Sequence, residues 1–444
     1  MKNNFAILGT IAIGAALGGA ALTPAIAQAQ AAETVNLVDS IQTQTGDVTA
    51  RVTITGGKIT VDYSKLPPGT IPLPPEVTAS NITSISTAIG NSFSAKVQNN
   101  LKLKGNVVQN ISGNVGAYNT VTTESAVPGE VAILSSAYGN TAQGEACCGG
   151  IDMNVTQNIT GGSVHADAEV TTAPGLGTLT MSASATGNAI GASVTNGPID
   201  LKAHQSNAGT ISANAKGTVC CNNNKITVGS SAVANSAISG SENSVVFSDV
   251  TQSNSGHVSA NSSHNTGSGT EIVSAAQATG NSIYTTNKWA YTQSAGTQHN
   301  SGKITATAHL TANNYKKSAT VGVAATGNSI LLSSQGSSGG VYGYQNNEVG
   351  GDVLSDGFLD GASNSGGVAQ ISSSAIGNAI TGYACASCGT GEVKLEGGTE
   401  QINAANTTAN VTVGSVAHVG TYGNIIAQAS AVGNSATFIA QRAN

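Results

Sequence analysis

Hydrophobic and polar side chains alternate one by one along most of the chain. In SVHADAEV (163–170) apolar residues occupy every second position from Val164 to Val170, and polar residues fill the positions between. KITATAHL (303–310) alternates in the same way. A period of two with β-branched residues is typical of strands that bury one face. We therefore expect β-structure, with little helix, beyond residue 33.

A short motif, seen in SASATGNAIGASV (182–194), recurs eight times. Each copy has an Ala, then Gly two positions later, then Asn; only the fourth copy replaces the Gly, with Ala234. Successive copies lie 46 to 56 residues apart. The other motif residues are Gly90, Asn91, Gly139, Asn140, Gly187, Asn188, Asn235, Gly280, Asn281, Gly327, Asn328, Gly377, Asn378, Gly433 and Asn434. Self-similarity at such a period indicates one long repeat array.

A second motif, Gln followed four positions later by Gly, interleaves with the first. The Gln comes 18 or 19 residues after the preceding motif position in six consecutive units, and 24 residues after it in the last. Its Gln residues are Gln42, Gln109, Gln157, Gln205, Gln252 and Gln298, and Gln345 and Gln401 keep the Gln without the Gly. Stacked Asn and Gln amides form ladders that satisfy buried polar groups.

The inward residues around the first motif are small, as in Ala183, Ala185, Gly187 and Ala189. Such a face packs only against something very close, and Gly permits the close approach of two backbones. The sequence predicts an all-β fold: an elongated β-solenoid, or β-helix, built from eight repeats of about 48 residues. Each repeat can form one large coil or two smaller ones, and two coils of about 24 residues is the interpretation we prefer.

The chain divides into three parts. Residues 1–31 read as a secretory signal peptide, with Lys2 before a long apolar run and small residues near its end; a retained membrane anchor is the alternative, because the run is near bilayer-spanning length. Residues 32–84 form the first unit, whose Pro-rich stretch KLPPGTIPLPP (65–75) is a loop or a cap over the first coil. Residues 85–444 form the repeat solenoid, and its last coil is a candidate open edge.

Composition excludes some functions. Charged residues are 9% of the chain and aromatic residues 4%, and the net charge is −6. Ordinary globular domains carry roughly 25% charged residues. Without a basic cluster to follow phosphates, nucleic acid is not an expected partner.

Six cysteines lie in Gly- or Asn-rich stretches: Cys147, Cys148, Cys220, Cys221, Cys385 and Cys388. An even number in an exported chain favours disulfides, each local or between adjacent coils. The alternative is a metal site, but the second half of a C-x-x-C site is missing, and adjacent cysteines chelate poorly. We expect no metal and no cofactor.

No catalytic constellation stands out. The stretch DVLSDGFLDG (352–361), with three Asp, is the best candidate for calcium or acid chemistry, and a solvated loop is the alternative. The seven His do not cluster in sequence. Trp289, Tyr284 and Tyr291 could stack on a sugar ring or equally form a packing patch. A glycosidase needs paired carboxylates on one face, so we expect no enzyme.

The eight Ala-x-Gly-Asn copies, the signal peptide and the scarcity of charge together resemble the holdfast attachment protein D family, holdfast anchor proteins of stalked alphaproteobacteria. A looser similarity links the repeats to curlin. The resemblance implies a protein that is exported by a curli-like route and is cell-surface, outer-membrane-associated or extracellular. It implies that this protein tethers an adhesive polysaccharide to the cell envelope beside other anchor-complex proteins. It supplies no catalytic residues. Alternatives are a β-helical polysaccharide-active enzyme and a curlin-like fibre subunit, and self-association through the terminal coils is a further expectation.

Overall fold

The computed structural model describes residues 35–56, 81–124, 126–172, 175–220, 223–364, 367–385, 393–418 and 424–441. The predicted signal peptide, the Pro-rich stretch, Cys221 and Cys388 lie outside the described residues. The chain divides into two units, residues 1–34 and Val35–Asn444, and all described residues belong to the second unit. Its described residues contain strands and turns without a helix, so none offers a helical membrane span.

Three parallel sheets of eight strands make up this unit. The strands of sheet 1 are β1 (Val35–Gln44), β4 (Lys102–Ile111), β7 (Gly150–Ile159), β10 (Ile199–Asn207), β13 (Val246–Asn254), β16 (Thr292–Asn300), β19 (Gly339–Asn347) and β22 (Leu395–Asn403). Those of sheet 2 are β2 (Val48–Gly56), β5 (Val115–Thr123), β8 (Ser163–Thr172), β11 (Thr210–Val219), β14 (Val258–Thr266), β17 (Ile304–Ala312), β20 (Val353–Asn364) and β23 (Thr407–His418). Those of the long sheet are β3 (Ile82–Val97), β6 (Val127–Cys147), β9 (Leu176–Thr195), β12 (Asn223–Glu242), β15 (Gly269–Lys288), β18 (Tyr315–Gln335), β21 (Val368–Cys385) and β24 (Ile425–Gln441).

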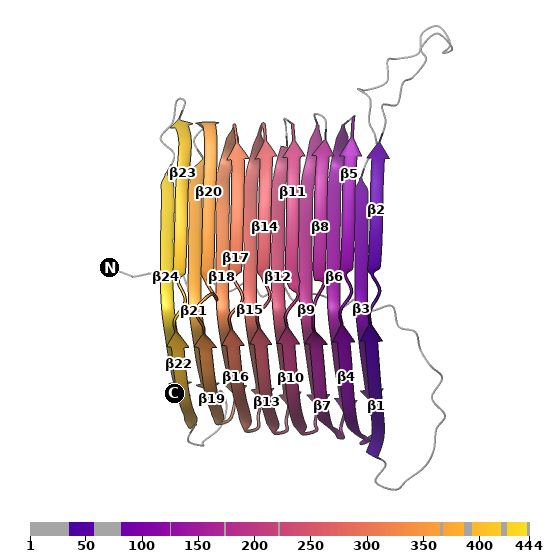
Figure 1. Cartoon of the computed structure of the whole chain (residues 1–444). Helices are drawn as coiled ribbons and strands as arrows, with labels where there is room; N and C mark the ends of the chain where they lie inside the picture. The colour runs from indigo at the N-terminus through magenta and orange to yellow at the C-terminus, as the bar shows by residue number, and fades with distance from the viewer. Residues whose placement is uncertain are drawn as a thin grey trace, which may run out of the picture. The chain divides into compact units, whose positions relative to one another are not determined.

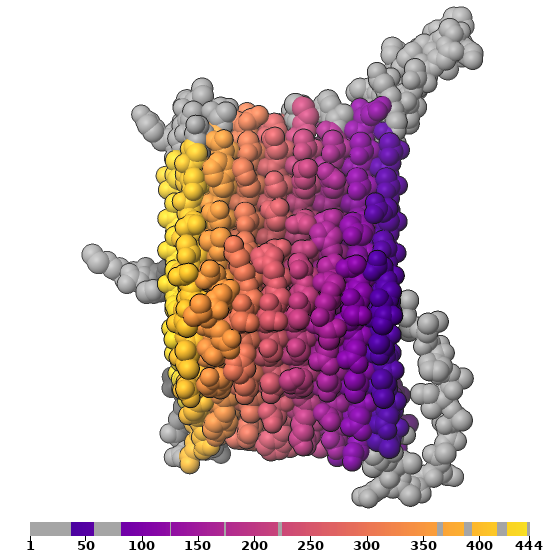
Figure 2. All heavy atoms as spheres, viewed as in Figure 1, coloured from indigo at the N-terminus to yellow at the C-terminus, as the bar shows by residue number. Residues whose placement is uncertain are grey.

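Each repeat is one coil with one strand in every sheet, so coil 1 is β1–β3 and coil 8 is β22–β24. Figure 1 shows the coils in chain order along the sheets, and Figure 2 shows them as adjacent bands. Equivalent motif residues pair in register: Gln205 with Gln252, and Asn188 with Asn235. The solenoid prediction is confirmed, whereas our interpretation of two coils per repeat is wrong. The Gly-Asn motif lies in the middle of a long strand instead of at a corner.

The long sheet packs against the other two sheets through two hydrophobic clusters. Sheet 2 packs on the first half of each long strand, with Val164, Ile211 and Leu179 among the buried residues. Sheet 1 packs on the second half, with Leu201 and Ile190 among them. The inward residues are small next to the motif, and larger aliphatic side chains fill the space farther from it.

The alternation of each long strand shifts by one position at the motif. Gly187 and Asn188 are both buried, Ala189 faces outward and Ile190 faces inward. Our placement of Ala189 on the inward face is therefore wrong. Two consecutive inward residues let one strand serve both clusters, with its polar Asn at the boundary between them.

Candidate functional site

The motif asparagines form a ladder along the centre of the long sheet. Each side-chain Nδ2 donates to Oδ1 of the Asn in the following coil at 2.8–2.9 Å, from Asn91 to Asn434. It also donates across the coil to a backbone carbonyl where sheet 1 ends, such as Ser206 O for Asn188 at 2.9 Å. The amides thereby satisfy each other and link the two layers of the coil.

The motif glutamines form a second ladder, in sheet 1, with the opposite direction. Each Nε2 donates to Oε1 of the Gln in the preceding coil at 2.6–2.9 Å, from Gln401 back to Gln42. It donates as well to a carbonyl of the long strand, such as Ser282 O for Gln252 at 2.9 Å. Most of these side chains are fully buried, so both ladders lie inside the coils and not on a binding surface.

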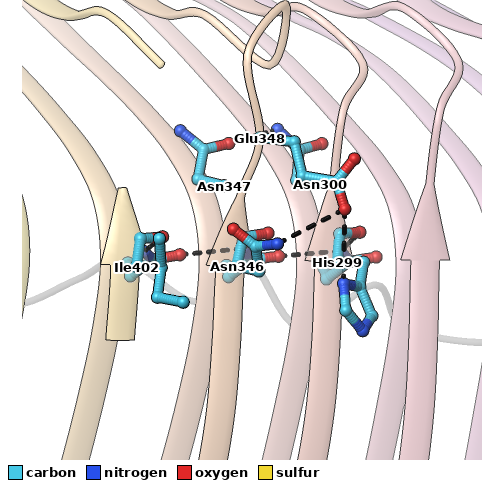
Figure 3. Close-up of polar contacts among 9 residues, drawn as sticks. His299, Asn300, Asn346, Asn347, Glu348 and Ile402 are labelled. Carbon is cyan, nitrogen blue, oxygen red and sulfur yellow. Dashed lines mark hydrogen bonds and ion pairs between the residues drawn. The ribbon is translucent and has the colours of Figure 1, made fainter. Parts of the chain in front are cut away.

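Sequence reasoning missed a third ladder, two positions after the Gln. Asn207, Asn254, Asn300, Asn347 and Asn403 bond in order at 2.7–2.8 Å, and Figure 3 shows Asn300 and Asn347 side by side. The signal was present as Gln-x-Asn in five units. It escaped notice because coils 2 and 3 carry Ile111 and Ile159 at this position.

The motif glycines allow neighbouring coils to touch through their backbones. A Cβ on Gly187 would lie 2.5 Å from Ala234 O, and one on Gly302 would lie 2.0 Å from Gly256 O. Real Cβ atoms do not approach so closely, and Gly has none. Most of the motif residues are buried, so the surfaces open to a ligand are the outer faces and the terminal coils.

The outer face of sheet 2 carries a Ser–His–Asp group that the sequence did not reveal. His165 Nδ1 is hydrogen-bonded to Ser212 Oγ in the next coil, and His165 Nε2 lies 2.6 Å from Asp167 Oδ2. Burial raises the pKa of Asp167, but hydrogen bonds from His165 and Asn214 outweigh it and leave that pKa lowered. Arg51 lies over the ring of Tyr118, 4.8 Å from its centroid, beside this group.

The strand that carries Ser212 offers this group no backbone donor for a hydrolase oxyanion hole. β11, which carries Ser212, is paired along its length with β8 on one side and β14 on the other. Strand N–H groups paired in this way cannot form an oxyanion hole, which needs free donors aimed at the reacting carbonyl. The group is better explained as a side-chain network that joins coils 3 and 4.

The acidic run 352–361 does not gather its carboxylates. Asp356 and Asp360 lie four residues apart in β20, and Asp352 just before the strand bonds Asn406 N and Nδ2 at 3.0 and 3.1 Å. Four strand residues span about 13 Å, which is too far for one cation. The solvated-loop interpretation is wrong, because nearly all of the run lies in β20, and the spacing of its carboxylates does not support the calcium candidate. Within the described residues no group of acidic, His and Cys side chains could hold a metal.

Three of the six predicted disulfide cysteines are free thiols: Cys147, Cys148 and Cys385. The Sγ atoms of Cys147 and Cys148 are 2.9 Å apart, whereas a disulfide bond is about 2.05 Å long. Pairing between coils fails because the register opposes Cys147 to Thr195, and Cys385 to Gln335 and Gln441. The disulfide prediction is therefore wrong for these three residues, whereas Cys220 is disulfide-bonded.

The predicted aromatic group separates into two faces. Tyr284 faces outward on the long sheet in the register row of Ile238 and Leu331. Trp289 and Tyr291 lie instead in the turn that leads into sheet 1.

New neighbours surround Trp289 and Tyr291 on sheet 1. The rings of Phe247 and Tyr291 are 6.3 Å apart, and Phe247, Trp289 and Tyr342 are 43%, 48% and 39% exposed. Burial, and then the nearby Tyr342 and Glu396, raise the pKa of Tyr291. We call Phe247, Trp289, Tyr291 and Tyr342 the aromatic platform.

A polar cluster lies on sheet 1 at the other end of the same strands (Figure 3). His299 Nδ1 is 3.5 Å from Glu348 Oε1, and Asn346 Nδ2 donates to that oxygen at 3.4 Å. The rings of His299 and Tyr344 are 5.4 Å apart. Sheet 1 thus presents the aromatic platform at one end of these coils and a cluster of rings and hydrogen-bonding groups at the other.

Among the described strands, β1 to β3 and β22 to β24 each pair on one side only, so each terminal coil has an open edge in this part of the chain. Leu37 and Ile41 in coil 1 are 61% and 80% exposed, and Ile426 and Phe438 in coil 8 are exposed as well. Both ends therefore present unpaired strands with apolar side chains.

Comparison with known proteins gives one match. A family model described as Holdfast attachment protein D matches residues 76–350. No curated protein and no solved structure matches the chain.

Proposed function

Because the chain belongs to the holdfast attachment protein D family, we propose that it is a non-enzymatic surface anchor that tethers the adhesive polysaccharide to the cell envelope. Membership implies a role in holdfast attachment. The proposal adds how the molecule performs it: the outer faces bind polysaccharide, and a terminal coil binds an envelope partner. The chain would be exported through its residues 1–31 and held at the outer membrane or cell surface.

The observation that supports polysaccharide binding is the repetition of polar side chains at one pitch. Register places Asn110, Asn158, Ser206 and Ser253 in one outward row of sheet 1. Neighbouring strands lie about 4.8 Å apart, so a polymer chain meets a new hydroxyl or amide at each coil. Each contact is weak, but contacts along one surface add through high effective concentration.

The open edges support the second attachment. A partner strand can extend a sheet by pairing with an exposed edge. The ladders offer further groups at this edge. The Gln401 side chain donates to coil 7 and to its own coil, and the described residues include no ninth coil whose Gln could donate to Gln401 Oε1. An anchor-complex protein or a second copy of this chain would bind here, and curlin-like fibres are the outcome if copies add without limit. We propose that residues 65–75 cap the other end.

The non-enzymatic part of the proposal rests on the outer faces of the described coils. The Ser212–His165–Asp167 group lies on a sheet whose backbone donors are used in pairing. Purified protein should therefore release no reducing sugar from holdfast polysaccharide. Hydrolysis that disappears in His165→Ala would revive the enzyme alternative.

Retention experiments test the tether. The mature protein is incubated with holdfast polysaccharide and, separately, with outer-membrane fractions, at 50 mM and 500 mM NaCl. Both should retain it at both salt concentrations, because the chain carries few charges and salt weakens only charge-based contacts. Retention by neither fraction, or full release at the higher salt concentration, contradicts the proposal.

A further inference from the structure

We propose that the aromatic platform is a saccharide-binding site for an uncharged polymer of hexopyranose units. The inference rests on the proposed function, because it assigns the polysaccharide contact to particular residues. The platform spans coils 5 to 7, with Phe247 in β13, Trp289 and Tyr291 before β16, and Tyr342 in β19.

The platform is built around glycines that leave room for its rings. A Cβ on Gly340 would lie 2.8 Å from Tyr291 Oη and 3.2 Å from Cε2 of Tyr342, so both tyrosines lean over this one position. A Cβ on Gly336 would lie 2.4 Å from Cε3 of Trp289. The indole therefore rests on the Gly336 backbone with nearly half of its residue surface open to solvent.

The backbone at Trp289 has a conformation that disfavours a bulky side chain. The turn from the long sheet into sheet 1 holds one residue with positive φ in successive coils: Asn196 at 59°, Asn243 at 64°, Trp289 at 69° and Gly336 at 76°. Asn and Gly tolerate this conformation, whereas a bulky residue there is a true outlier. Strain of this kind is found at functional sites.

The chemistry of the platform selects the ligand class. A pyranose ring has an apolar face of C–H groups that stacks on an aromatic ring, and its hydroxyls bond to tyrosine hydroxyls and carboxylates at the rim. Register places Glu396 beside Gly340, the position over which both tyrosines lean. A carboxylate at this place repels an anionic sugar, so an uncharged polymer fits best.

Trp289 is the sole tryptophan, so its fluorescence reports on the platform directly. The full mature chain is titrated with cellohexaose, maltohexaose and chitohexaose, and with the hexamer of mannuronic acid as the anionic probe. At least one neutral hexamer should change the emission in a saturable way, and the anionic one should bind at least tenfold more weakly. Failure of all neutral hexamers, or tighter binding of the anionic one, overturns the proposal.

Variants separate binding from folding. Trp289→Asn, the residue of the preceding coil, should weaken calorimetric binding of the neutral hexamer at least tenfold, with an unchanged or higher melting temperature. The matched control Tyr284→Ser removes an outward ring of the long sheet in the same coil and should leave binding unchanged. Unchanged binding in Trp289→Asn, or a melting temperature lowered by it as much as by a core substitution, means that Trp289 is a packing residue.

Retention on holdfast polysaccharide distinguishes this proposal from the tether itself. Loss of retention in Trp289→Asn, with retention of the wild type, supports the platform. Equal retention of both proteins overturns the platform and leaves the anchor in place. Absence of retention already in the wild type overturns the anchor, and the platform falls with it.

Discussion

Replacing one interior ladder asparagine should destabilise the protein far more than replacing the last one. Asn281 is fully buried, accepts a hydrogen bond from Asn235, and donates to Asn328 Oδ1 and His299 O, all at 2.8 Å. A net contribution of about 1 kcal/mol per hydrogen bond gives about 3 kcal/mol for Asn281→Ala. The vacated partners remain buried, so the loss should not fall below this value.

Asn434 is the matched control at the end of the same ladder. It accepts one bond from Asn378 at 2.8 Å and donates one to Gln401 O at 3.3 Å, at the open edge of coil 8. Water can replace those partners, so Asn434→Ala should cost about 1 kcal/mol. The free energy of unfolding is measured by guanidinium titration followed by circular dichroism. Equal losses in the two variants would refute the idea that the buried ladder holds adjacent coils together.

Three further predictions follow from packing and ionisation. Ala185→Leu should lower the free energy of unfolding by about 1–3 kcal/mol, because the Ala185 side chain is fully buried. Thr186→Leu, on the outer face, should change it little. Equal shifts in the guanidinium midpoint would mean that the two faces are misassigned. Gly256→Ala places a Cβ 1.9 Å from a carbonyl and should lower the melting temperature, while Gly46→Ala, with nothing nearer than 3.9 Å, should not. Burial lowers the pKa of His264 to about 4, and neither ring nitrogen has a partner among the described residues. As the pH falls, the unfolded chain therefore takes up the proton first, and the free energy of unfolding should fall by about 3 kcal/mol between pH 6.5 and pH 4. Urea titrations at several pH values should show that His264→Leu removes this dependence. An unchanged dependence of the free energy of unfolding on pH in this variant would contradict the burial of His264.

Sequence alone was sufficient for the repeat, the strands and the ladders of the two motifs. These follow from local rules. A hydrophobic period of two specifies strands, and a repeat of about 48 residues places equivalent residues of successive coils beside each other. Coil size was not accessible in this way, because a Gly-Asn pair suits both a corner and a shift inside a long strand. The position of Ile190, two residues after Asn188, distinguishes a corner from a shift inside a strand. Both residues are buried, so the inward alternation continues after the motif.

Sites made by neighbouring coils were also beyond the sequence reading. His165 and Ser212 are 47 residues apart, and Trp289 meets Gly336 at a similar separation. Their contact depends on the register between coils, which fixes every outward row at once. Tyr284 was grouped with Trp289 by closeness in sequence, but β15 ends between them, and Trp289 lies in the turn that leads to sheet 1.

The fate of the adhesive in cells that lack this gene tests the anchor most directly. Holdfast polysaccharide is quantified by lectin staining on washed cells and in the culture medium, for the wild type, the deletion strain and the complemented strain. The anchor role predicts that the deletion strain still makes the polysaccharide but releases it into the medium, and that complementation returns it to the cells. Polysaccharide that stays on the deleted cells at the wild-type level would contradict the role.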